Sequence, residues 1–258
     1  TAAWAPWLPV WTYPWIGCVA GVAAGAALGL LLGFFHLELG ADLIVAGVGI
    51  NILASGLTVL LMAALVGDKG STSALTSYPL PNIVWPYVSD VPLLGPLLNG
   101  DGGRGHHVLT YAAFAATALV AWVFYRTPFG LRLRAVGESP VAARQVGLSV
   151  PRIQYLSLLA SGVLAGLGGV FLSMGYLTFF QADMTAGRGY LALAIVYLGA
   201  RQPVGTAVAA LAFGGFAVMA AQLGYFAIPS QIILMIPPIV TILALVAFAR
   251  RGRAASVP

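Results

Sequence analysis

Long apolar runs dominate the pattern along the chain, and they predict membrane-spanning helices. A helix needs about 20 largely apolar residues to cross a bilayer. Four runs reach that length, and they lie at Ile16–Leu37, Leu43–Gly67, His107–Tyr125 and Ile153–Ala182. The first two are separated by only a few residues and predict a tight helical hairpin. The fourth is longer than one crossing needs, so we expect its far end to bend or re-enter.

The C-terminal part continues this pattern. Pro203–Ala249 carries no charge and is long enough for two crossings, with a break expected near Gly224–Pro229. Between these runs, Asp183–Ala200 is expected to form a short seventh crossing with Arg188 near its start. The sequence therefore predicts an all-α integral membrane protein, a polytopic helical bundle with about seven spans in this chain.

The polar connection Arg126–Arg152 is the most informative break in the apolar pattern. It holds five of the chain's 12 Lys and Arg residues and one acid, Glu138. Basic connections stay on the cytoplasmic side, because Lys and Arg resist translocation. Ser139 suits an N-cap, Pro140 a first helical position and Gly147 a helix end. The predicted helix, Pro140–Val146, is too short to be stable alone, which indicates a docking element.

The cytoplasmic position of this connection predicts the side of every other one. Ile153 then runs outward, and three crossings bring the basic tail Arg250–Arg253 back inside, as the charge rule requires. Thr1–Trp15 falls outside, where its Trp and Tyr side chains suit the membrane interface.

Residues 68–106 are then predicted to be extracytoplasmic. Their prolines exclude one continuous helix, and short helical pieces are expected, for example around Pro92–Leu98. Two interpretations of this segment remain open. It is either a docking surface for an external partner or a plain lid over the helices.

Composition excludes several other classes of protein. The chain is 60% hydrophobic and 7% charged, against about 25% charged residues in soluble domains. Its net charge of +5 follows from topology-setting clusters, and no basic surface with stacking aromatic residues indicates nucleic-acid binding. His106 and His107 are adjacent and diverge on a helix, so no metal site is expected. No catalytic pattern and no GxxxxGK[ST] phosphate loop occurs, so we expect neither an enzyme nor a cofactor site in this chain.

Glycines recur every fourth residue in the first predicted span. This spacing places them on one helix face, where missing side chains let a second helix approach closely. The pattern predicts a tightly packed helix pair, and its members are Gly17, Gly21, Gly25, Gly29 and Gly33, with the same spacing at Gly162 and Gly166.

Polar residues also follow one face of the second predicted span, where Asn51 and Thr58 share a helical face with Gly47, Ser55 and Met62. A lone Asn in a span should face protein or a water-filled cavity. Interhelical hydrogen bonding and a polar substrate route both remain open. Arg188, between two glycines, has two interpretations as well. It lies either at the external interface or in the pathway.

One segment carries a resemblance to a known family. The stretch FGLRLRAVGESPVAARQVGLSV strongly resembles the cytoplasmic signature "AVGxxPxAARxxGI" of permease subunits in bacterial ABC importers of simple sugars, nucleosides and branched-chain amino acids. Leu148 stands where isoleucine is common. GVGINILASGLT, YLTFFQADMTAGRGYLALAIVYLG and VSDVPLLGPLL look most like the nucleoside-type permeases. The signature positions are Ala135, Val136, Gly137, Pro140, Ala142, Ala143, Arg144 and Gly147.

The resemblance implies roles for named residues. In the family this segment is the coupling helix, which fits a cleft on the ATPase subunit. The residues expected to serve ATPase coupling here are Gly137, Glu138, Pro140, Ala142, Ala143, Arg144 and Gly147, with direct contacts from Glu138, Ala142, Ala143 and Arg144. Arg132 and Arg134 are expected to support that surface or to touch lipid phosphate. The candidate pathway residues are Asn51, Thr58, Phe180, Met184 and Arg188.

The resemblance also implies partners and a location. These are a second, different permease chain, two ATPase subunits that bind ATP and Mg²⁺, an extracytoplasmic substrate-binding lipoprotein and membrane lipid, all at the bacterial cytoplasmic (inner) membrane. Family members usually begin with a further hydrophobic region, so an N-terminal region is expected to be missing, and a full-length member would have about ten spans.

The expected function is nucleoside import by alternating access in a single permease domain, residues 1–258. Import of ribose- or galactose-like simple sugars is the first alternative. An ion-coupled secondary transporter is disfavoured, because it needs acidic or His residues at mid-membrane and Glu38, Asp42 and Asp183 lie at span ends. An intramembrane enzyme is disfavoured because no nucleophile–base pair is visible.

Overall fold

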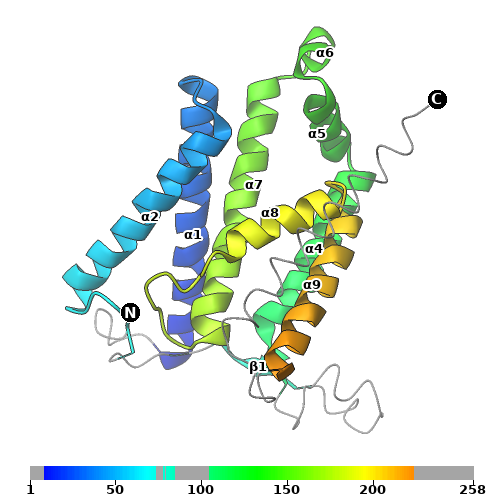
Figure 1. The fold of residues 1–258 in the computed structure, drawn as a ribbon. Coiled ribbons are helices and arrows are strands. Elements are labelled where there is room, and N and C mark those ends of the chain that lie inside the picture. Colours follow the sequence, from blue (N-terminus) through cyan, green and yellow to red (C-terminus); the bar gives the residue numbers. More distant parts are fainter. Residues whose placement is uncertain (1–8, 74–77, 79, 85–104, 224–258) are drawn as a thin grey trace, which may run out of the picture. The chain divides into compact units, whose positions relative to one another are not determined.

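Helices form nearly all of the regular structure in the computed structural model, which describes residues 9–73, 78, 80–84 and 105–223 (Figure 1). A 3-10 turn, η1, opens the described part, and two π-helical turns, η2 and η4, extend α1 and α7. The elements in chain order are η1 (Val10–Thr12), α1 (Tyr13–Gly33), η2 (Phe34–Glu38), α2 (Leu43–Leu65), β1 (Asn82–Ile83), β2 (His106–His107), α4 (Val108–Arg126), α5 (Pro128–Glu138), α6 (Pro140–Gln145), α7 (Val150–Phe171), η4 (Leu172–Tyr176), α8 (Arg188–Leu198) and α9 (Pro203–Leu223).

Four helices in the described part are long and apolar enough to cross a membrane. They are Tyr13–Glu38, Leu43–Leu65, Val108–Arg126 and Val150–Tyr176. Each agrees within a few residues with a run predicted from hydropathy, because the length of an apolar run must match the hydrocarbon thickness. The fourth crossing ends with η4 at Tyr176, so the apolar run up to Ala182 is not one continuous helix, and a bend or re-entry of its far end stays a prediction. The polytopic helical fold is confirmed.

The predicted crossing over Asp183–Ala200 is wrong in its extent. Its helix, α8, begins only at Arg188 and has 11 residues, about 17 Å against a hydrocarbon core of about 30 Å. Asp183 and Ala186 have φ values of 56° and 43°, in the left-handed region that stops a helix, and Gly187 has 74°. An earlier helix start is therefore excluded, and α8 is long enough for little more than half of the hydrocarbon core.

α9 corresponds to the first of the two spans predicted for residues 203–249. The break near Gly224–Pro229, the second span and the basic tail lie outside the described residues. The helical pieces expected around Pro92–Leu98 and most of the aromatic N-terminus lie outside them as well.

The chain's contacts group it into two compact units. The first comprises Thr1–Ala116 and Tyr125–Met184, with α1, α2, α5, α6 and α7, and the second comprises Thr117–Phe124 and Thr185–Pro258, with α8 and α9. The single permease domain expected from the sequence stays a prediction. In the second unit α8 and α9 form a hairpin so close that a Cβ on Gly199 would overlap the backbone of Thr206.

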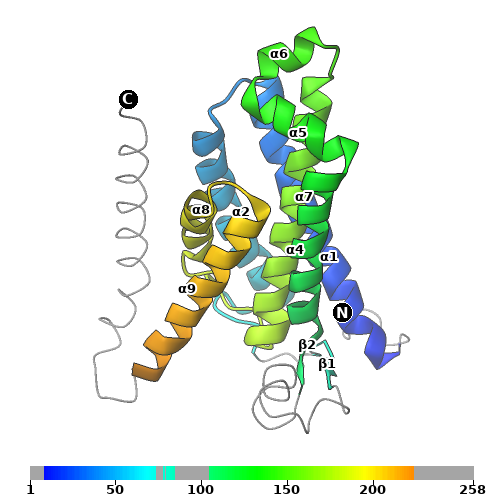
Figure 2. The same ribbon diagram turned by 90° about the vertical axis from the view of Figure 1, so that its right-hand side faces the viewer.

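α1 and α7 form the tightest pair in the first unit, and they run antiparallel side by side (Figures 1 and 2). Gly17 of α1 faces Met174, just beyond the end of α7, whereas Gly33 faces Tyr155 near the start of α7. Between them, a Cβ on Gly25 would overlap the carbonyl oxygen of Gly162. The predicted glycine-mediated helix pair is confirmed, because only glycine lets two backbones approach this closely.

Contacts at the two ends of this pair agree with the sides assigned from charge. The hydroxyl of Tyr155 donates to the carboxylate of Glu38 at 3.2 Å, which places the end of α1 beside the start of α7 and the basic connection. At the opposite end, Gly175 lies against the ring of His107, the residue before α4. The connections predicted to be cytoplasmic and extracytoplasmic therefore lie at opposite ends of this helix pair, and the side of the membrane for each end stays a prediction.

Two short backbone links tie the extracytoplasmic ends together. β1 pairs antiparallel with β2, so Asn82 faces His107. The segment after α2 pairs with the segment after α7. The Thr72 N–H donates to the Phe180 carbonyl, and the Phe180 N–H donates to the Thr72 hydroxyl, each at 2.9 Å. These links hold the beginning and end of the predicted external segment 68–106 against the helices.

Candidate functional site

Two helix caps in succession shape the connection between α4 and α7, which is predicted to be cytoplasmic. The Thr127 hydroxyl accepts the Gly130 N–H at 3.2 Å and starts α5. Ser139 ends α5, and its hydroxyl accepts the Ala142 N–H at 3.3 Å to start α6. The predicted helix Pro140–Val146 is confirmed to within one residue, because its signals are local: a capping Ser, a following Pro and a left-handed Gly147 with φ of 82°.

α5 itself was not predicted from the sequence. The available signal was Thr127–Pro128, the same N-cap and first-position pair as Ser139–Pro140. This helix leads up to α6, which lies at the end of the first unit where α7 begins (Figure 1).

α6 is attached to the unit through one side chain, Ala143, which is 3% exposed. It packs in an apolar cluster with Val136 of α5 and with Val150 and Ile153 of α7. The expected contact between Ala143 and an ATPase stays a prediction, and in this chain the methyl group of Ala143 is covered by its own neighbours. Within the chain, Ala143 docks the helix that carries the other expected contact residues.

Sequence reasoning missed two exposed apolar residues, one within α6 and one at its C-cap. Val141 is 66% exposed and Val146 is 75% exposed. The signal was available, because Val141 and Val146 are the bulkiest apolar residues in a short polar helix and flank the docking Ala143. The expected coupling residues Gly137, Glu138, Pro140, Ala142, Arg144 and Gly147 are all exposed around them.

The candidate pathway residues are only partly brought together. Asn51 is exposed on α2, and its amide has no hydrogen-bond partner among the described residues. The hydroxyl of Thr58 bonds within its own helix, to the Ser55 carbonyl at 2.8 Å. Thus no interhelical hydrogen bond of this polar face is found in the described part of the chain. Phe180 lies beyond the outer end of α2, beside Thr72.

Met184 and Arg188 stand on either side of the division between the two units. Met184 ends the first unit and is partly buried in the turn before α8. Arg188 is the exposed first residue of α8 in the second unit. A site that joins Arg188 to α2 therefore stays a prediction. No three His, Cys, Asp or Glu side chains of the described ranges gather closely enough to hold a metal ion.

His107 is a buried polar group at the extracytoplasmic end. Its Nδ1 accepts the Leu109 N–H at 3.3 Å and caps α4, its ring meets the edge of Phe171, and its Nε2 is buried with no partner among the described residues. Burial lowers the pKa of His107 below the ordinary 6.5, against a smaller opposing effect of the Met174 backbone. The neutral ring is thus the form that the fold accommodates.

We expect acid to destabilise the protein through His107. The folded state binds the proton less readily than the unfolded state, so this contribution to stability is complete above pH 6.5 and is lost as the pH falls through the lowered pKa. His107→Asn keeps a capping acceptor but cannot ionise, so thermal unfolding followed against pH should become flatter. His106→Asn, at the neighbouring residue, is the control. An unchanged slope in His107→Asn would contradict the assignment.

Comparison with known proteins agrees with a helical membrane protein that carries several spans. The chain matches the family described as "Branched-chain amino acid transport system / permease component" over residues 2–245. No solved structure matches it significantly.

Three curated relatives are similar over most of the chain. The guanosine ABC transporter permease protein NupQ of Bacillus subtilis (strain 168) is 35% identical over 93% of this chain and 75% of its own length. The nucleoside ABC transporter permease protein NupC of Lactococcus lactis subsp. cremoris (strain MG1363) is 31% identical over 91% and 73%. The putative glucose ABC transporter permease protein TsgC13 of Haloferax volcanii is 30% identical over 78% and 58%. With its apolar spans and these similarities, the chain belongs to the family of permease components of branched-chain amino acid type transport systems.

Proposed function

We propose that this protein is the transmembrane permease subunit of an ATP-binding cassette importer that carries nucleosides by alternating access. The observation that carries the coupling role is α6, a short capped helix held by Ala143 with Val141 and Val146 projecting from the cytoplasmic end. The substrate class rests on the relatives, two of which are named as guanosine and nucleoside permeases.

The subunit composition follows from the same proposal. Two ATPase subunits would bind ATP and Mg²⁺, a second permease chain would complete the pathway and an external lipoprotein would deliver substrate. The complex would lie in the bacterial cytoplasmic membrane. The ATPase is the partner proposed for the exposed face of α6, because two bulky apolar side chains in water are stabilised by a covering surface.

A continuous set of contacts would transmit the ATPase motion to the spans. Ala143 packs against Val150 and Ile153, so movement of α6 must displace the first turns of α7. α7 in turn contacts α1 backbone to backbone at Gly25 and Gly162. Because so close a contact has no soft side chains to absorb a shift, α1 and α7 would move as one rigid pair.

Within the pathway, the polar face of α2 is the part that would meet substrate. The Asn51 amide can donate and accept hydrogen bonds, as recognition of a ribose or a base requires. Its cost in lipid is offset if it faces a water-filled route or the second permease chain.

Simple-sugar import is the alternative, favoured by the similarity to the putative glucose permease. Uptake of labelled guanosine by cells that express the full transporter distinguishes the two. We expect excess unlabelled nucleoside to compete and excess glucose or ribose not to compete, and we expect an ATPase to co-purify with the permease. Competition by sugar alone would contradict the nucleoside assignment. Purification of the permease without an ATPase would contradict the assignment to an ATP-driven importer.

A further inference from the structure

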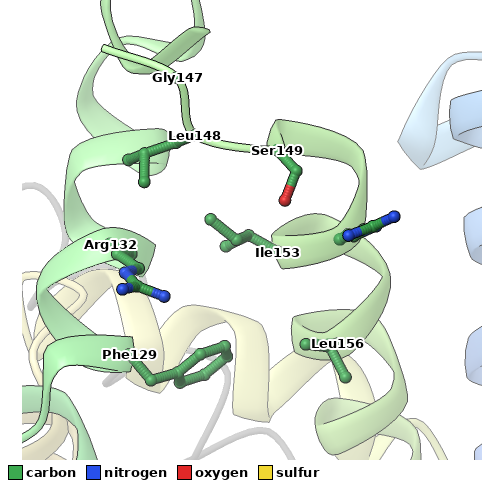
Figure 3. Close-up of a pocket in the computed structure, with 8 residues that line it drawn as sticks. Phe129, Arg132, Gly147, Leu148, Ser149, Ile153 and Leu156 are labelled. Carbon is green, nitrogen blue, oxygen red and sulfur yellow. The ribbon is translucent and has the colours of Figure 1, made fainter.

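A pocket of about 370 Å³ opens at the cytoplasmic end of the first unit, between α5 and the first turns of α7 (Figure 3). Phe129 and Arg132 extend into it from α5, and Ser149, Ile153 and Leu156 face them from the α7 side. The connection that follows α6 closes one end. The pocket thus adjoins the coupling helix but is separate from its exposed face.

The pocket carries positive charge that the described residues do not neutralise. Arg132 and Arg152 both line it, both are exposed, and neither has an ion pair or a hydrogen bond with any described residue. Arg134, two positions along α5, differs. It donates to the Gly130 carbonyl at 3.4 Å and lies 6.0 Å from the centre of the Tyr125 ring. Arg132 and Arg152 are therefore the two guanidinium groups in the pocket lining that can bind an anion.

Part of the pocket lining is apolar and reaches into the membrane span. Phe129 is partly buried, Ile153 is in the core cluster and Leu156 is 50% exposed. α7 begins its span at Val150, so Leu156 lies in the second turn of a membrane-crossing helix. The basic groups and the apolar wall lie together at the level where headgroups meet hydrocarbon.

We propose that this pocket binds an anionic phospholipid of the cytoplasmic leaflet. The phosphate lies between Arg132 and Arg152, whose planar guanidinium groups match phosphate oxygens in pairs, and the Ser149 hydroxyl, which makes no capping bond, is free to donate to it. An acyl chain follows Phe129, Ile153 and Leu156 into the membrane. Anionic lipids are concentrated at this face of the membrane and are attracted by Lys and Arg near its surface.

Two other occupants fit less well. A free phosphate would satisfy the arginines but leave the apolar wall exposed. An acidic protein segment would have to descend to the second turn of a membrane span to cover Leu156. Only an amphiphile with an anionic head and a hydrocarbon tail matches both halves of the pocket.

The test uses the purified full transporter and phosphatidylglycerol as the probe, with phosphatidylcholine as the neutral comparison. Native mass spectrometry counts retained lipids, and a titration in mixed micelles measures affinity. We expect the double variant Arg132→Gln/Arg152→Gln to bind phosphatidylglycerol about 30-fold more weakly, from the loss of two basic residues near the surface. Arg126→Gln removes one exposed charge from the same connection but not from the pocket, and it should keep wild-type affinity.

Three results would overturn the proposal. The double variant could retain wild-type affinity, Arg126→Gln could lose as much as the double variant, or inorganic phosphate at the lipid's concentration could displace the bound phosphatidylglycerol. The last result would show that the pocket binds a small anion. None of these results touches the proposed importer function, which guanosine uptake and ATPase co-purification test separately.

Discussion

We expect Gly166→Ala to separate α7 from α1 and to destabilise the transporter, whereas Gly168→Ala, two residues along the same helix, should not. A Cβ on Gly166 would lie 2.7 Å from the Gly21 carbonyl oxygen and 3.0 Å from the Val22 Cα, which are backbone atoms that cannot rotate aside. No described atom lies within 4 Å of a Cβ on Gly168. Overpacking of this kind costs about 1–3 kcal/mol.

The pair of variants makes this a matched comparison. Both add one methyl group to α7, and in an open position that change favours a helix by about 0.5–1 kcal/mol. Thermal unfolding of the purified complex, read by a tag-free fluorescence or size-exclusion assay, should therefore move in opposite directions. Equal melting temperatures in the two variants would mean that the glycine contact does not limit how closely α1 and α7 pack.

The second large effect is expected at α6, where a core residue and a surface residue lie three positions apart. Ala143→Glu places a carboxylate in the cluster of Val136, Val150 and Ile153, where no described cation pairs with it. Burial of an unpaired charge is among the most destabilising substitutions. Since α6 has six residues and is not stable alone, we expect it to detach, with loss of both ATPase binding and guanosine uptake. Limited trypsin digestion at Arg144 should become faster.

Val146→Asp should abolish coupling by a different route. Val146 is 75% exposed, so the charge meets water in the free subunit and α6 stays docked. Trypsin digestion and the melting temperature should match wild type, while the ATPase no longer co-purifies and uptake falls. Val84→Asp, the same change at an exposed residue near β1 on the opposite side, should leave ATPase co-purification intact. Wild-type uptake by Val146→Asp would exclude this face as the coupling surface.

The contrast between Ala143 and Val146 shows where sequence reasoning reached its limit at the candidate site. The caps of α6 are local, so Ser139, Pro140 and Gly147 predicted the helix and its ends. Which side of that helix faces outward depends on how α5 and α7 pack around it, which the order of residues in the signature does not show. The family pattern therefore indicated a short helix in the correct place, but it did not show that Ala143 belongs to the chain's own core.

Other differences have equally specific physical causes. The sequence around α8 predicted a short crossing that begins at Asp183, but left-handed backbone at Asp183 and Ala186 delays the helix to Arg188. Arg132 and Arg134 looked equivalent in the sequence, yet their neighbours differ. Arg134 is held by a carbonyl and an aromatic ring, and Arg132 lines a pocket.

The sequence by itself determined four membrane spans, the glycine-mediated helix pair and the short capped helix, and its charges predict the sides of the connections. Each of these depends on run length, net charge or a spacing of a few residues, which are properties of contiguous chain. Only the tertiary structure decided which face of α6 is exposed, which arginines remain unpaired and where the pocket lies. These depend on residues that are distant in sequence and meet only when α5, α6 and α7 pack together.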